Sequence, residues 1–236
     1  MAAAYTVAKL MPNTDTLTGW LEAGGSTEWA LQNYYDLKGE ESLATFDVPQ
    51  RLVLSYVLDL PLGKNKKFLN HSGGADKVVS GWGVEGTATL QHGFPVFLNT
   101  ASNLTGSFGG GSRPNIDTSA CPHGAPVSGS AESRLNMWFN TSCFMQPPAF
   151  TFGNVSRTLP NVRTDGLTNI DFALFKNTAF GPEDRMGLQF RAEVFNLFNT
   201  PQFGYPGNSL GTPQFGVVSS QVNNPRLIQF GLKFLF

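Results

Sequence analysis

The stretch RLIQFGLKFLF at residues 226–236 decides the fold class of this chain. Apolar side chains occupy every second position, and successive side chains of a β-strand point to opposite faces. The stretch therefore predicts a strand with one uniformly apolar face and one mixed face. The apolar face carries Ile228, Phe230, Leu232, Phe234 and Phe236, and the mixed face carries Leu227, Gln229, Gly231, Lys233 and Leu235.

The same alternation recurs upstream and predicts about six strands in all. Five further stretches show it, the last more weakly: 186–198, 168–180, 50–60, 77–92 and 4–10. The longer stretches are close to the 9–11 residues that a tilted transmembrane strand needs. Their second face carries charged or amide side chains near the strand centre. Both features favour an antiparallel transmembrane β-barrel, which has a lipid-facing and a water-facing side.

A barrel assigns each alternating position to lipid or to the lumen. The polar positions that we expect to face the lumen are Arg51, Glu85, Gln91, Asp171, Gln189, Arg191, Glu193, Gln229 and Lys233. The apolar positions that we expect to face lipid are Leu52, Leu54, Tyr56, Val84, Leu188, Phe190, Phe230, Leu232, Phe234 and Phe236. A soluble, secreted β-sandwich binding module, for example for carbohydrate, is the alternative, since its strands alternate as well.

The connections between the predicted strands alternate in length. In chain order they span 11–48, 61–76, 99–166, 181–184 and 200–225, so the first, third and fifth are the long ones. Outer-membrane barrels have long loops outside the cell and short turns in the periplasm. If the last strand runs inward, every long connection lies outside. Residues 61–76 are long for a periplasmic turn, so this agreement is imperfect.

Composition supports an all-β chain and excludes other classes. The 236 residues include 26 Gly, 15 Pro and 20 Phe, and only 14% are charged. A disordered chain would carry more charge and fewer aromatic rings, and a helical bundle would carry less Gly and Pro. The net charge of −1 shows no footprint for nucleic acid. No apolar run reaches the length of a transmembrane helix.

Six strands do not close a barrel, because bacterial barrels have at least eight. An open sheet in lipid would leave the polar groups of its edge strands without partners. The start of the sequence, MAAAYTVAKLM, also does not resemble a signal peptide. We therefore expect residues 1–236 to be the C-terminal portion of a larger barrel.

No motif predicts an enzyme, a cofactor or a metal site. GWGVEG at 81–86 matches G-x-G-x-x-G but lies within a strand pattern, where glycines of a curved strand explain it better than a dinucleotide site. The nucleophile elbow G-x-S-x-G does not occur. Asp171 and Glu193 could form an acid–base pair, but a charge network in the lumen is the simpler interpretation.

Two further features concern single residues. Cys121 and Cys143 match no zinc pattern. They either form a disulfide, which would close a 23-residue loop worth about 3 kcal/mol, or remain unpaired thiols. Phe236, with Phe230, Leu232 and Phe234 on the same face, fits the aromatic C-terminal strand that the barrel-assembly machinery reads in outer-membrane proteins.

The sequence also resembles a known family. LQFRAEVFNLFNTPQFGYPG at 188–207 and VNNPRLIQFGLKFLF at 222–236 closely resemble the C-terminal end of TonB-dependent receptors of the Oar-like type. Four upstream runs resemble the same proteins in the same order. They are YDLKGEESLATFDVPQRLVLSYVLDLPLGKNKKFL at 35–69, VVSGWGVEGTATLQHGFP at 78–95, WFNTSCF at 138–144 and NIDFALFKN at 169–177.

This resemblance implies a 22-stranded plugged barrel, of which the chain would be roughly the last quarter. Such receptors lie in the outer membrane of Gram-negative bacteria and import scarce solutes with energy supplied through TonB. The implied partners are outer-membrane lipid, the barrel-assembly machinery, the TonB system and an unknown solute. The plug, the TonB box and the N-terminal carboxypeptidase-regulatory-like domain of the family are not found in residues 1–236. A passive barrel or structural protein is the alternative function.

Overall fold

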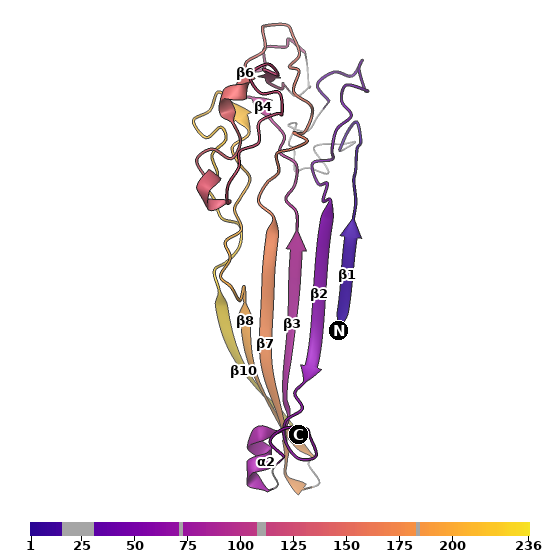
Figure 1. Ribbon diagram of the computed structural model, residues 1–236, viewed down its shortest axis with the longest axis vertical. Helices are drawn as coiled ribbons and strands as arrows, with labels where there is room; N and C mark the ends of the chain where they lie inside the picture. The colour runs from indigo at the N-terminus through magenta and orange to yellow at the C-terminus, as the bar shows by residue number, and fades with distance from the viewer. Residues whose placement is uncertain (16–30, 71–72, 108–111, 183–184) are drawn as a thin grey trace.

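One antiparallel sheet forms the long axis of the molecule (Figure 1). The computed structural model describes residues 1–15, 31–70, 73–107, 112–182 and 185–236. The sheet has the order β1-β2-β3-β7-β8-β10, in which every pair of neighbours is antiparallel. Its strands are β1 (Ala2–Val7), β2 (Gln50–Asp59), β3 (Trp82–Gln91), β7 (Leu167–Phe180), β8 (Met186–Phe195) and β10 (Leu227–Leu235). The prediction of an all-β chain with six principal strands is confirmed.

Several strands have other bounds than the sequence predicts; the strand expected at 186–198, for example, ends at Phe195. The strand expected at 77–92 begins only at Trp82, because Gly74–Val79 forms a short helix, α2. Gly81 separates the two elements with a φ of +76°, and a Cβ atom there would lie 2.0 Å from the carbonyl oxygen of Asn177. The chain therefore turns sharply just before β3. The weak stretch at 4–10 is a six-residue strand that ends at Val7.

The register sorts the side chains onto two faces. Residues opposite one another in an antiparallel pair point to the same side. Glu85 of β3 lies opposite Ala173 of β7, which in turn lies opposite Glu193 of β8. Followed across all six strands, the register brings together on one face, here called the polar face, every residue expected in the lumen. The opposite face, called the apolar face, carries the residues expected to contact lipid.

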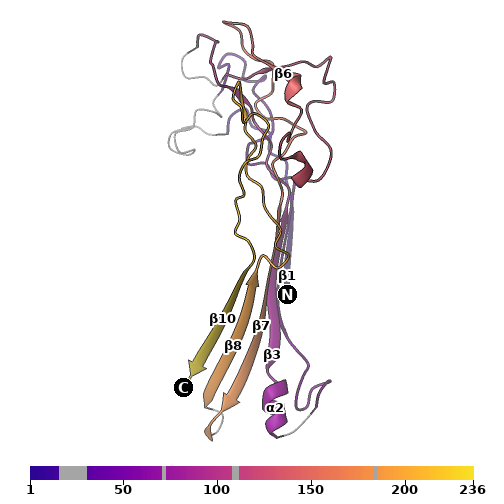
Figure 2. The same cartoon turned by 90° about the vertical axis from the view of Figure 1, so that its left-hand side faces the viewer.

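The sheet is twisted and stays open. In Figure 2, β1 and β3 overlap while β7, β8 and β10 fan out, as a strongly twisted and curved sheet does when viewed from the side. Among the described residues, β1 pairs only with β2 and β10 pairs only with β8. The strands form one sheet rather than the two packed layers of a sandwich. No described helix is long and apolar enough to cross a membrane.

The two ends of the sheet are unlike (Figure 1). Connections 8–49, 92–166 and 196–226 leave the sheet at one end, called the loop end. Connections 60–81, which includes α2, and 181–185 lie at the other, called the turn end. The predicted segregation of long and short connections is therefore present.

The compact core lies in the loops rather than on the sheet. The described parts of the three long connections are called the loop body. Within it, connections 92–166 and 196–226 bury a cluster of apolar side chains: Val96, Leu98, Cys121, Ala125, Trp138, Phe139, Cys143, Phe144, Val155, Leu159, Val162 and Val218. Short elements organise it. They are β4 (Asn99–Thr100) with β9 (Ser209–Leu210), β5 (Asn115–Ile116) with β6 (Phe144–Met145), and the 3₁₀ turns η1 (Glu132–Arg134) and η2 (Thr141–Cys143).

Candidate functional site

A charge network lies at the centre of the polar face. The guanidinium of Arg191 on β8 pairs with the carboxylates of Glu193 on the same strand and Glu85 on β3. β7 lies between β3 and β8, so the Arg191–Glu85 pair spans an intervening strand. The small side chain of Ala173 stands at that position of β7, which leaves room for the crossing. All three charged side chains are only partly exposed.

Asp171 has a different role on the same face. Its carboxylate accepts hydrogen bonds from the backbone N–H of Asn196 (2.9 Å) and the side-chain amide of Asn169 (2.9 Å). Asn196 directly follows β8, so this carboxylate holds the chain where it leaves that strand. Glu193 is instead bound to Arg191. Glu193 therefore belongs to the charge network, whereas the carboxylate of Asp171 is hydrogen-bonded to uncharged groups.

The remaining predicted polar residues lie along the same face at different heights. Arg51 and Gln91 are opposite each other near the loop end. Gln189 lies nearer the turn end, where it donates from Nε2 to the side-chain oxygen of Asn177 (2.8 Å). Gln229 and Lys233 on the outermost strand β10 are opposite Glu193 and Gln189. The polar face thus carries hydrogen-bonding groups over its whole length.

A groove of about 560 Å³ runs over this face beside the charge network. Side chains of Ser55, Glu85, Thr87, Asp171 and Glu193 line it, with Val57, Ala173 and Phe195 between them. These groups can bind a solute by hydrogen bonds and charge. Within the described residues, no group of His, Cys, Asp and Glu side chains could hold a metal ion.

The apolar face is bare in the structure, most of all on β10. Phe230 and Leu232 are about 70% exposed, and Phe236 is fully exposed. The rings form a ladder along the strand: Phe230 stacks on Phe190 with centroids 6.3 Å apart, and Phe234 lies 5.7 Å from Phe180 and 6.1 Å from Phe236. Of the four residues predicted as an assembly signal, Phe230, Leu232 and Phe234 lie on the edge strand β10 and Phe236 directly follows it.

Three arginine–carboxylate pairs join two of the long connections in the loop body. The arginines all come from 92–166 and the carboxylates all come from 8–49. The pairs are Arg113–Glu40, Arg157–Asp15 and Arg163–Asp47. All three carboxylates are nearly inaccessible to solvent. Buried charges of this kind are stable only when paired and hydrogen-bonded, so the pairs determine how the two connections meet.

Arg157 is the most completely enclosed of the three arginines. Besides its pair with Asp15, it donates to the backbone carbonyls of Pro12 (2.8 Å), Glu40 (3.2 Å) and Ser42 (3.4 Å). Burial lowers the pKa of the neighbouring Arg113 below its usual value, while its pair with Glu40 opposes that shift. An arginine stays charged at neutral pH even so.

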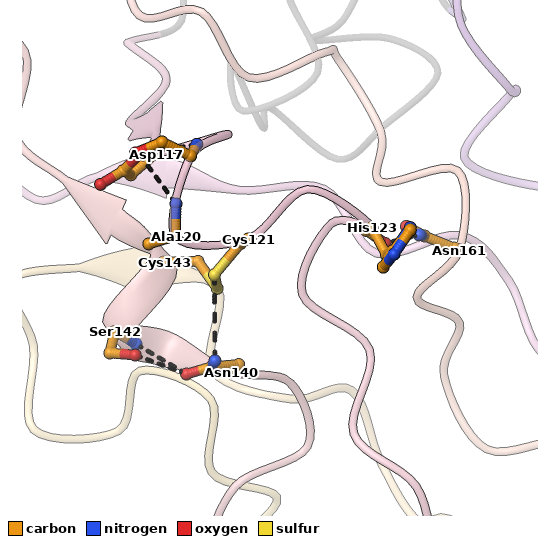
Figure 3. The surroundings of a disulfide bond; sticks show 9 residues. Asp117, Ala120, Cys121, His123, Asn140, Ser142, Cys143 and Asn161 are labelled. Carbon is orange, nitrogen blue, oxygen red and sulfur yellow. Dashed lines mark hydrogen bonds between the residues drawn. A yellow bond between two sulfur atoms is a disulfide. The ribbon is translucent and has the colours of Figure 1, made fainter.

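The sequence leaves open whether the two cysteines form a disulfide, and the structure contains one. Cys121 and Cys143 are joined, with their Cα atoms 5.9 Å apart (Figure 3). Asn140, beside the bond, accepts from the backbone N–H of Ser142 (3.2 Å) and starts the turn η2 that carries Cys143. The bond fastens two turns to the core of the loop body.

Sequence reasoning did not find the buried ion pairs. The signal that could have indicated them is the presence of single arginines between apolar residues, as in NVSRTLPNVRT at 154–164, in a chain with few charges. Which carboxylate each arginine meets does not follow from spacing, since Asp15 and Arg157 are 142 residues apart.

Comparison with known proteins agrees with this architecture. A family model described as "Outer membrane beta barrel domain" matches residues 1–229. None of the curated proteins and none of the solved structures compared with the chain matches it.

Proposed function

Because this chain belongs to the outer membrane β-barrel domain family, we propose that it forms part of a TonB-dependent receptor that imports a scarce solute. The family places the chain in the outer membrane of a Gram-negative bacterium. The proposed receptor acts by binding and passage, without covalent chemistry and without a cofactor. In it, the apolar face contacts lipid and the nine polar residues predicted from the sequence line the lumen.

The observation that carries the proposal is the loop body over one end of a two-faced sheet. Its two longest connections are joined by buried ion pairs and a third is packed on the same core, as the hydrogen bond from Val218 N–H to the Leu135 carbonyl (2.8 Å) illustrates. A folded outer body offers a surface of constant shape for recognising one solute. A passive pore needs no such surface, so this feature favours a receptor.

The free edges of the sheet support a larger barrel. Each edge strand exposes backbone N–H and C=O groups that lipid cannot satisfy. We infer that further strands continue the sheet beyond β1 and β10, so that residues 1–236 are one sector of the barrel. The resemblance to Oar-like receptors implies 22 strands and a plug in the lumen.

The test compares two strains of the source bacterium, one lacking the coding segment for residues 1–236 and one lacking TonB. Spent culture medium of each strain is profiled by mass spectrometry. We expect at least one solute to remain unconsumed in both strains and to be consumed by the parent. A solute left only by the first strain would indicate a passive barrel. If every solute is consumed as by the parent, import is not the function.

A further inference from the structure

The connection 60–81, called the basic turn, concentrates positive charge at the turn end. Four of the 16 basic side chains of the protein lie in it, namely Lys64, Lys66, Lys67 and Lys77, against one acidic residue, Asp76. The whole chain carries a net charge of −1, and the neighbouring turn 181–185 has the sequence GPEDR. The positive charge is therefore a local feature of the basic turn.

The fold of the basic turn leaves its lysines free for a partner. Asp76 accepts from the backbone N–H of Lys64 (2.6 Å), so its carboxylate shapes the turn. Backbone bonds from Gly63 N–H to the Phe68 carbonyl (3.1 Å) and from Lys66 N–H to the Gly63 carbonyl (3.0 Å) complete it. All four lysine side chains are exposed, and in the described part of the chain none of them takes part in a salt bridge.

Apolar side chains accompany these charges. Phe68, Leu69 and Val78 are between 52% and 69% exposed. The ammonium of Lys67 lies 5.4 Å from the centre of the Phe68 ring. Basic residues interleaved with exposed apolar ones are typical of protein segments that lie at the surface of an anionic membrane.

Two side chains of the apolar face fasten the basic turn to the lipid side of the sheet. Trp82 donates from Nε1 to the Val78 carbonyl (3.0 Å), and Lys176 donates from Nζ to the Ser80 carbonyl (2.6 Å). The Lys176 ammonium also lies 5.2 Å from the Trp82 ring. Tryptophan, and lysine near the end of a membrane segment, are residue types of the membrane–water interface. The basic turn therefore lies at headgroup depth, on the outside of the sheet.

We propose that the basic turn binds the anionic headgroups of glycerophospholipids in the periplasmic leaflet. The lysines contact the headgroup phosphates, and Phe68, Leu69 and Val78 enter the boundary between headgroups and acyl chains. This proposal depends on the membrane location of the chain and not on solute import. Lipid binding by the basic turn can therefore fail while solute import holds, and solute import can fail while lipid binding holds.

The test uses the full chain in micelles of a zwitterionic detergent, with dioleoylphosphatidylglycerol or dioleoylphosphatidylethanolamine added, and native mass spectrometry to count bound lipids. The test variant is K64Q/K66Q/K67Q, which removes three exposed charges and the contact of Lys67 with the Phe68 ring, but no described side-chain hydrogen bond or salt bridge. The matched control is K9Q/K38Q/R226Q, which removes the same number of exposed charges from connections 8–49 and 196–226 at the loop end. Far-ultraviolet circular dichroism checks that both variants keep their strands.

We expect the parent and the control to bind phosphatidylglycerol in preference to phosphatidylethanolamine, and the test variant to bind phosphatidylglycerol roughly 100-fold more weakly. Equal binding of phosphatidylglycerol by the two triple variants would overturn the proposal. A second arm incubates the chain with purified peptidoglycan sacculi. Lysine-dependent retention on sacculi that phosphatidylglycerol micelles do not reduce would assign the turn to the cell wall instead.

Discussion

At the scale of single residues, the protein uses its few charges in two distinct settings. On the polar face, Arg191 and its two glutamates are partly exposed and linked across strands. In the loop body, Asp15 and Arg157 are almost fully buried and paired. A partly exposed pair contributes little to stability, whereas the loss of one partner from a buried pair is costly.

Replacement of Arg157 by alanine tests the buried setting. The change leaves the Asp15 carboxylate buried without its partner, and we expect it to destabilise the loop body by about 3–5 kcal/mol. Limited proteolysis of connections 8–49 and 92–166 measures the effect as faster cleavage. The exposed Arg226 provides a matched control, because R226A should change stability by no more than about 0.5 kcal/mol. Equal cleavage of the two variants would contradict the structural role of Arg157.

Asp117 provides a pH-dependent prediction near the disulfide. A hydrogen bond from the Ser119 hydroxyl, with backbone N–H bonds from Ala120 and Ser119, lowers the pKa of the Asp117 carboxyl below its usual 3.8. The group therefore stabilises its turn fully above 3.8, and this contribution is lost as the pH falls through the lower, folded-state pKa. Carboxyl ¹³C NMR should place the midpoint below 3.8, and S119A should raise it. A midpoint at or above 3.8 in the parent protein would contradict the hydrogen-bond assignment.

At the scale of elements, neighbouring residues of one strand have opposite environments. Phe190 on the apolar face of β8 lies opposite Leu232 and stacks on Phe230. Gln189, the preceding residue, lies on the polar face opposite Lys233. The packing of β7 against β3 also depends on the face. On the polar face the ring of Phe175 covers Gly83, where a Cβ atom would lie 2.2 Å from the ring. The environment of each strand residue therefore depends on which face it lies on and on the residues opposite it in the neighbouring strands.

The pair F190R and Q189R tests the assignment of faces. Arginine at position 190 would face hydrocarbon near the middle of β8, and we expect a cost of about 2–4 kcal/mol in a lipid bilayer. Arginine at position 189 would face water and should be tolerated. Denaturant unfolding in phospholipid vesicles, performed on the assembled barrel, measures both. The facing assignment fails if the two variants are equally stable.

At the scale of the whole molecule, buried apolar side chains are distributed in the opposite way from a soluble β-protein, whose core lies on its sheets. The compact core lies in the loop body, while the strands of the main sheet expose large apolar side chains, among them Phe230 and Leu232. A soluble protein rarely shows a large continuous apolar surface. The proposed lipid contact explains this distribution, because hydrocarbon rather than water would then surround the apolar face.

This distribution predicts how the isolated chain behaves in solution. We expect it to aggregate in detergent-free buffer and to disperse in mild detergent, since detergent covers the apolar face. Size-exclusion chromatography with light scattering measures the difference. A monomer in detergent-free buffer would contradict the placement of the apolar face in lipid.

The sequence predicted most of the sheet, because the alternation of side chains is a local property. Leu52 and Arg51, or Phe190 and Gln189, reveal their faces through nearest neighbours alone. The boundary at Trp82 was not predicted, since Val78 falls in phase with the apolar positions of the strand although Gly74–Val79 is helical and Gly81 turns the chain. The loop body was not predicted either, because Gly- and Pro-rich sequence has no period from which packing can be inferred.

The sequence by itself therefore determined the all-β class, the strand faces and the alternation of long and short connections. Each of these follows from contacts within a strand or from distances along the chain. Only the tertiary structure decided that Cys121 meets Cys143, that Asp15 meets Arg157, and that Trp82 and Lys176 fasten the basic turn to the apolar face. The physical reason is that such contacts join residues from different segments, and their energy depends on burial that exists only after the chain has folded.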